Sequence, residues 1–243
     1  KVFGPGRILG TQYGTYPYGA YVTDISVRNL LEHMVGGWPN DGNDPVFQQL
    51  NLNQNDLMHH ILNNCPGSPC SLTTVPGTQA VYSNAGYFIL GRIIEQVTGQ
   101  SYEAALKTQL AQPLGISDLY IGSDSLAGKR SNEVVYYPQE PYPAYNNFNL
   151  PRLDSVGGWI AAGPDLVRLL YDVEINHGWS PYAHYGWWNH TGALPGTGTL
   201  FVRDSMVPGS VYTWSVLTNT RHMPQEVFFE TMRTTLQNTI NGI

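Results

Sequence analysis

The chain has 243 residues, a formal net charge of −6 at pH 7 and only 12% charged residues. This length is enough to bury a full-sized core, and a weakly acidic balance offers no electrostatic footprint for nucleic acid or anionic lipid. No apolar run approaches the roughly 18 residues that a membrane-spanning helix needs. We expect no cofactor and no metal site.

The first part of the chain changes from irregular to helical. Residues 1–22 are rich in Gly, Tyr and Pro without helical periodicity, so we expect an irregular segment there. Ser26 can cap a helix that we expect to end at Gly36-Gly37. A short helix should follow over residues 55–63. The apolar residues that repeat at helical spacing in the first helix are Val27, Leu30, Leu31 and Met34.

The two cysteines, Cys65 and Cys70, bracket a Pro-Gly-Ser-Pro turn that can bring their sulfurs together. We expect a disulfide, which fits a secreted, extracellular or periplasmic protein. A two-ligand metal site is the alternative interpretation, although no His or Asp cluster in the sequence completes it.

The clearest helical pattern covers residues 84–98, behind a turn at residues 75–78. Gly99 then stands where helices commonly end in the left-handed conformation. Ser101 should cap the next helix. The buried stripe expected on the helix over 84–98 is Phe88, Ile89, Ile93, Ile94 and Val97.

Residues 122–155 form a long polar loop with several prolines, and long ordered loops often line sites. Gly157 and Gly158 follow and are expected to serve close packing. The run Gly163-Pro164-Asp165 then starts a helix, because Pro suits the first helical position and an acidic residue suits the first turn.

The last third of the chain changes to a β pattern. Three β-rich runs, Tyr185 to Gly192, Thr197 to Arg203 and Val211 to Thr218, predict an antiparallel meander. Residues 224–240 should form a closing helix. Its expected apolar face contains Val227, Phe228, Met232, Leu236 and Ile240.

Two short motifs stand out against this background. Tyr82-Ser83-Asn84 lies at the start of a helix, and His190-Thr191-Gly192 lies on an expected strand. The block from Pro76 to Ile121 and the run from Trp187 to Thr197 supply matching flanks. With these flanks, the chain resembles the serine β-lactamase and penicillin-binding-protein family, which includes class C β-lactamases, DD-peptidases and esterases.

The resemblance implies an α+β, β-lactamase/transpeptidase-like fold, in which an antiparallel sheet with a C-terminal helix lies beside a mostly helical lobe. We expect a single domain over residues 1–243, with the helical lobe at about 23–180. The sheet and the closing helix should occupy about 181–243. The site of this family is the cleft between the lobes, and its ligand is peptide-like or ester-like.

Residue by residue, the resemblance makes Tyr82 the proton shuttle and Asn84 the residue that holds the substrate amide. A plainer interpretation of the same tripeptide is that Ser83 or Asn84 simply caps the helix that follows.

In the second motif, His190 takes the position of the family's lysine. Thr191 and Gly192 form one wall of the site, and Ala193 lends its backbone N–H to the oxyanion hole.

The family's first motif, Ser-x-x-Lys, does not occur in the sequence. The three lysines are Lys1, Lys107 and Lys129, and no serine stands three positions before any of them. Nor is there a Gly-x-Ser-x-Gly nucleophile elbow. The sequence from Lys1 onward resembles the part of the family that follows the nucleophile helix, so we expect the N-terminal strands and that helix to be missing.

Three functions remain open at this point. The chain is part of a serine hydrolase whose Ser-x-x-Lys comes from a separate N-terminal segment, a pseudoenzyme that binds a peptide, glycan or protein, or an extracellular structural protein. The expected partners are a complementing N-terminal fragment or a second copy, paired through an incompletely covered sheet edge at Val211 to Thr218.

Overall fold

The computed structural model describes residues 1–63, 72–139, 145–175, 187–204 and 211–242. Helices and antiparallel strands both occur, which confirms the α+β class. The chain forms two compact units, each made of two segments. Unit one is Lys1–Thr108 with Phe148–Trp159, and unit two is Gln109–Asn147 with Ile160–Ile243.

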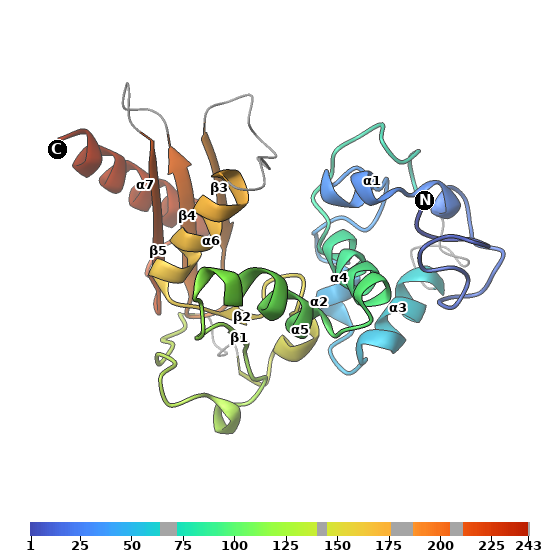
Figure 1. Ribbon diagram of the computed structural model, residues 1–243, viewed down its shortest axis with the longest axis horizontal. Helices are drawn as coiled ribbons and strands as arrows, with labels where there is room; N and C mark the ends of the chain where they lie inside the picture. The colour runs from blue at the N-terminus through green and yellow to red at the C-terminus, as the bar shows by residue number, and fades with distance from the viewer. Residues whose placement is uncertain (64–71, 140–144, 176–186, 205–210, 243) are drawn as a thin grey trace. The chain divides into compact units, whose positions relative to one another are not determined.

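Unit one is mainly helical (Figure 1). Helices α3 and α4 confirm the two helices expected there, with Ser83 capping the start of α4 and Gly99 ending it at a φ of 68°. The elements of unit one are η1 (Val22–Asp24), α1 (Val27–Leu31), α2 (Pro45–Gln48), α3 (Gln54–Asn63), α4 (Asn84–Thr98), α5 (Tyr102–Leu106) and η5 (Leu150–Leu153).

Helix α1 is shorter than expected. Ser26 caps it as expected, but the helix stops at Leu31, well before Gly36-Gly37. His33 takes a left-handed conformation with a φ of 56°, and its carbonyl accepts a hydrogen bond from the N–H of Val81 at 2.8 Å. A tertiary hydrogen bond therefore takes the place of another helical turn.

Unit two holds a three-stranded antiparallel sheet in the order β3-β4-β5, which confirms the expected meander for the described residues. Successive residues of β4 face opposite sides of the sheet. Leu200 and Val202 pack against Phe228 of α7 on one face. On the other face, the Arg203 guanidinium lies 5.8 Å from the ring centroid of Tyr171 in α6. Helices α6 and α7 therefore cover opposite faces (Figure 1).

Unit two begins within the π-helical turn η2 (Lys107–Ala111), and a second sheet of two strands consists of β1 and β2. The remaining elements are η3 (Gln112–Leu114), β1 (Tyr120–Ile121), η4 (Leu126–Gly128), β2 (Trp159–Ile160, of which Trp159 belongs to unit one), α6 (Gly163–Ile175), β3 (Trp187–Gly192), β4 (Gly198–Asp204), β5 (Tyr212–Thr218) and α7 (Gln225–Asn241).

The buried faces of α4 and α7 differ in part from the expected ones. Ile94 and Val97 on α4 are 38% and 72% exposed, and Val227 on α7 is 52% exposed. Phe229, which the apolar stripe did not include, is buried beside Phe228. Each helix thus presents a narrower or rotated face, because the neighbouring elements decide which side is covered.

The two glycines expected to serve close packing behave differently. A Cβ atom on Gly158 would lie 2.5 Å from the carbonyl oxygen of Leu150, so this position allows no side chain. A Cβ atom on Gly157 would meet nothing within 4 Å, and the expectation for this residue was wrong.

Among the described residues, no helix combines the length and the hydropathy that crossing a membrane requires.

Candidate active site

The Tyr82-Ser83-Asn84 turn is built by the start of α4. The Ser83 hydroxyl accepts a hydrogen bond from the N–H of Gly86 at 3.1 Å, so Ser83 is a helix cap and is fully buried. Tyr82, one residue earlier, is 44% exposed, and Asn84 begins the helix at 7% exposure. The cap draws Ser83 inward and commits its hydroxyl to the helix end, which leaves Tyr82 as the accessible side chain of the motif.

His33 supports this turn from one side. Its ring centroid lies 4.3 Å from that of Tyr82 and 4.9 Å from that of Tyr87. Its Nδ1 atom accepts a hydrogen bond from the N–H of Ser83 at 3.1 Å. Because a backbone N–H only donates, Nδ1 carries no proton, and the neutral ring is protonated on Nε2. His33 therefore fixes both the backbone of the motif and the plane on which Tyr82 rests.

Asn40 and Asp44 support the turn from another side. The Asn84 Nδ2 atom donates to Asn40 Oδ1 at 3.0 Å and to Asp44 Oδ2 at 2.9 Å. The N–H of Asn40 also donates to the carbonyl of Tyr82 at 2.9 Å. Asp44 is 1% exposed and caps α2 by accepting from the N–H of Val46. Burial raises the pKa of the Asp44 carboxyl, and the hydrogen bonds from Asn84 and Val46 oppose that rise.

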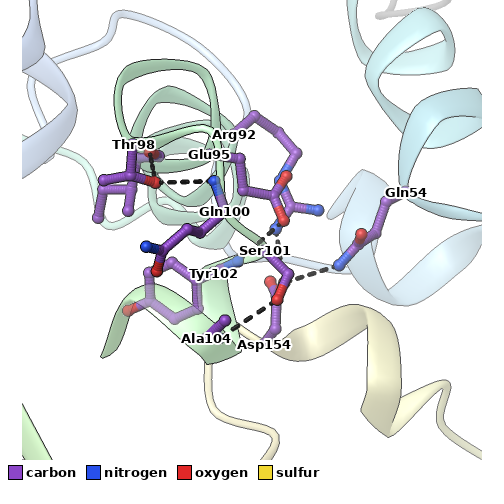
Figure 2. A network of polar contacts seen from close by, with 10 residues as sticks. Gln54, Arg92, Glu95, Thr98, Gln100, Ser101, Tyr102, Ala104 and Asp154 are labelled. Atoms are coloured by element: carbon purple, nitrogen blue, oxygen red, sulfur yellow. Dashed lines mark hydrogen bonds and ion pairs between the residues drawn. The ribbon is translucent and has the colours of Figure 1, made fainter. Parts of the chain in front are cut away.

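A buried polar network holds α4 in place behind the turn (Figure 2). The Arg92 guanidinium, 3% exposed, contacts Asp154 Oδ2 at 2.6 Å and Glu95 at 3.1 Å. Gln54 Nε2 donates to the same Asp154 oxygen at 2.7 Å, and Glu95 accepts from the N–H of Tyr102 at 3.0 Å. The network joins α3, α4, α5 and the end of η5, so the helix that carries the motif is fixed by partners from distant parts of the sequence.

The second motif lies on β3 in unit two. His190 pairs with Phe201 of β4, and the two rings stack with their centroids 5.8 Å apart. Desolvation of the imidazole lowers the pKa of His190, and a hydrogen bond with the Thr191 backbone opposes this. Thr191 pairs with Leu200, so its side chain falls on the opposite face of the sheet from His190. A Cβ atom on Gly192 would meet nothing within 4 Å.

A tight turn follows this motif. Ala193 packs at the edge of the cluster formed by Leu200, Val202, Phe228 and Phe229. The N–H of Thr197 donates to the carbonyl of Leu194 at 2.9 Å. Gly196 has a φ of 76°, and a Cβ atom there would lie 2.8 Å from the Pro138 nitrogen. The backbone N–H that the oxyanion prediction uses thus belongs to a turn that is fixed inside unit two.

The expected site residues fall into two groups. Tyr82 and Asn84 lie together in unit one, and His190, Thr191, Gly192 and Ala193 lie together in unit two. Cys65 and Cys70 are outside the described residues, so their disulfide stays a prediction.

Each of the three lysines is engaged where it stands. Lys1 contacts Asp24, Lys107 pairs with Glu103 at 2.6 Å, and Lys129 donates to the carbonyl of Glu133. Within the described parts of the chain, no cluster of three or more His, Cys, Asp or Glu residues could hold a metal ion.

His33, Asn40 and Asp44 were not among the site residues predicted from the sequence. Asp44 did carry a local signal, because an Asp directly before a Pro is a good start for a helix. Nothing local predicts that the same carboxylate accepts a hydrogen bond from a side chain 40 positions later.

Comparisons with known proteins agree with the motifs. The profile of the family described as Beta-lactamase matches residues 16–180. Penicillin-binding protein 4 of Amycolatopsis lactamdurans is 51% identical over 148 residues, which are 58% of this chain and 36% of that protein. Esterase EstB of Burkholderia gladioli is 28% identical over 152 residues, which are 59% of this chain and 37% of that protein. The chain thus spans less than half the length of the curated relatives it matches.

Solved structures show the same fold. The D-amino acid amidase of Ochrobactrum anthropi SV3, in complex with D-phenylalanine, superposes with a TM-score of 0.64 at 16% identity. The superposition covers 90% of this chain and 73% of the amidase. The fold is therefore β-lactamase/transpeptidase-like, as the motifs predicted.

Proposed function

The chain belongs to the β-lactamase family, and on that premise we propose that its residues form most of a serine hydrolase site that cleaves an amide or an ester. The observation that carries the proposal is the Tyr82-Ser83-Asn84 turn. The Ser83 hydroxyl caps the helix, while Tyr82 stays exposed with its ring against the ring of His33. In this proposal, Tyr82 takes the proton from a serine hydroxyl as the serine attacks the substrate carbonyl, and later returns it to the leaving group.

The strand motif has the complementary role. Ala193 donates its backbone N–H to the oxyanion that forms on the carbonyl, and Thr191 with Gly192 lines one wall. His190 stands where the family has a lysine. The pKa of His190 is lowered from its ordinary value, which favours the neutral ring, and in this proposal the imidazole acts as a hydrogen-bonding partner.

The nucleophile in this proposal is a serine of a Ser-x-x-Lys segment that is not among these 243 residues, either upstream in the same polypeptide or on a separate chain. The amide or ester class rests on relatives whose names include a penicillin-binding protein, an esterase and a D-amino acid amidase. We further propose that the protein acts outside the cytoplasm, which the predicted Cys65–Cys70 disulfide would suit.

Covalent labelling tests this function. Protein isolated from its source is treated with a fluorophosphonate and, separately, with a penicillin probe, and the adduct is located by tandem mass spectrometry. We expect one adduct, on a serine with a lysine three positions later, while the recombinant 243-residue chain alone keeps its mass.

The variant Tyr82→Phe, introduced into the protein that carries the labelled serine, should slow labelling by roughly 100-fold or more, because the general base is lost. Tyr87→Phe is the matched control, since Tyr87 also stacks on His33 but its hydroxyl donates to the carbonyl of Leu31. An adduct on any serine of these 243 residues would contradict the proposal. Tight binding of a peptide without any adduct would make the chain a binding module.

A further inference from the structure

The carboxamide of Asn84 is held in one orientation. Its nitrogen donates to Asn40 Oδ1 at 3.0 Å and to Asp44 Oδ2 at 2.9 Å. An ionised carboxylate can only accept hydrogen bonds, so the group that faces Asp44 must be the NH₂ end of the amide. The position of Asp44 thereby decides which way Asn84 is turned.

In this orientation, Asn84 can make a further hydrogen bond only as an acceptor. A carboxamide nitrogen has two hydrogens, and both are used by Asn40 and Asp44. In the described parts of the chain, no hydrogen bond reaches the Asn84 Oδ1 atom. The atom with spare capacity is therefore an acceptor.

The two partners are themselves fixed without any ligand. Asp44 is 1% exposed and is bound to the N–H of Val46 as the cap of α2. Asn40 is tied through its own N–H to the carbonyl of Tyr82. Reversing the amide of Asn84 would place its carbonyl oxygen, an acceptor, against the acceptor oxygens of Asn40 and Asp44, and would leave the buried Asp44 carboxylate without its donor.

We propose that Asp44 and Asn40 are positioning residues that hold Asn84 as a hydrogen-bond acceptor, so that Asn84 binds an N–H donor in the site. The donor is either an N–H of the substrate or the ammonium group of the site's lysine. This inference rests on the proposed function, and it sharpens the expected role of Asn84, because an amide substrate would be held by its N–H and not by its carbonyl.

The first test measures the orientation itself and needs no activity. In the variant Asp44→Asn, the new side chain can turn its NH₂ group toward Asn84, and Asn84 must then turn over to accept from it. We expect the side-chain NH₂ protons of Asn84 to exchange with water at least about tenfold faster in Asp44→Asn than in the unaltered chain, measured by ¹⁵N NMR.

The matched control is Asp41→Asn. Asp41 lies close enough to help raise the pKa of Asp44, but its carboxylate accepts from the N–H of Asn43 at 2.7 Å and makes no described bond to Asn84. This control removes the same charge and should leave the Asn84 exchange rate unchanged. Equal rates in both variants would overturn the inference. If Asp44→Asn does not fold, the exchange rate of the Asn84 NH₂ protons in the unaltered chain tests the inference. A rate as fast as that of surface asparagines would also overturn the inference.

The second test identifies the donor in the protein that carries the nucleophile. Two substrates are compared that differ only in an N–H or an oxygen next to the acyl carbon. A fall of about tenfold in the preference for the N–H substrate in Asp44→Asn assigns the substrate N–H. An equal loss of kcat for both substrates assigns the lysine ammonium.

Unchanged kinetics for both substrates would overturn the role in the site. Absence of turnover in the unaltered protein, together with slow exchange of the Asn84 protons, would refute the proposed function and leave the positioning of Asn84 intact.

Discussion

The two motifs are held by opposite means. The Tyr82-Ser83-Asn84 turn depends on side chains that arrive from far along the chain, with His33 on one side and Asn40 and Asp44 on another. The His190-Thr191-Gly192 strand depends on a regular backbone ladder with β4. A position such as Gly192, with open space around it, can accept a side chain, whereas removal of the Asp44 carboxylate would take away one of the two partners of the buried Asn84 amide.

The contrast implies different tolerances to mutation. Unit one should lose stability when a single buried polar partner is removed, and unit two should lose it when backbone packing is obstructed. Substitutions in both units test this difference.

The largest effect is expected from Arg92→Met. This change leaves the Asp154 carboxylate buried without its cation, and such a loss costs about 3–5 kcal/mol. Chemical denaturation followed by tryptophan fluorescence measures it. The control is Arg28→Met, which breaks an exposed pair with Glu32 at 3.9 Å and should cost less than about 1 kcal/mol. Similar losses in both variants would remove the basis for the contrast.

A glycine pair tests unit two. A Cβ atom on Gly198 would lie 2.7 Å from the Phe228 ring, so Gly198→Ala should cost about 1–3 kcal/mol. Gly192→Ala meets open space and should change the free energy of unfolding by less than about 0.5 kcal/mol. Thermal unfolding of the two variants gives the difference. Strong destabilisation by Gly192→Ala would mean that the motif strand is packed more tightly than its geometry indicates.

Removal of the helix cap gives a smaller change. Ser83→Ala should cost about 1 kcal/mol, because Gly86 loses its acceptor. Ser101→Ala removes the equivalent cap of α5 at a comparable cost. The two variants should differ at His33, whose ring resonances are expected to move in NMR spectra only with Ser83→Ala, since the N–H of Ser83 donates to that ring. Movement in both variants would show that the turn is not held locally.

The smallest effect concerns pH. The pKa of His190 lies below its ordinary value of 6.5, and burial lowers the pKa of His60 in unit one as well. Between pH 6.5 and the lowered pKa values, the unfolded chain therefore binds more protons than the folded chain. The free energy of unfolding should fall as the pH drops through that window. NMR titration of the two imidazoles gives the midpoints. A midpoint for His190 above 6.5 would contradict the prediction, and His190→Gln should remove its share of the pH dependence.

The helices and strands that follow from apolar periodicity and from cap and turn residues could be predicted from the sequence. Helix α4 has a strong apolar repeat between Ser83 and Gly99, and the strands of the meander alternate between turns, so both were predicted correctly. The early end of α1 was not, because a hydrogen bond between His33 and Val81 decides it. The roles of Asn40 and Asp44 depend on contacts across 40 or more positions, and local patterns carry no record of such contacts. The two motifs themselves were found because the family shares them.

Arg152 connects the turn to the order in which the chain is made. Its guanidinium, 2% exposed, donates to the carbonyls of Val46, Gln49 and Leu52, and so holds the end of α2 whose start is capped by Asp44. A four-residue helix has no stability of its own. The helix that carries this carboxylate therefore gains the support of Arg152 only after the ribosome has released residue 152, about a hundred positions after α2. The residues of the turn are synthesised early and this support is added late, so a chain interrupted before Arg152 would contain both Asp44 and Asn84 without the guanidinium that holds the end of α2.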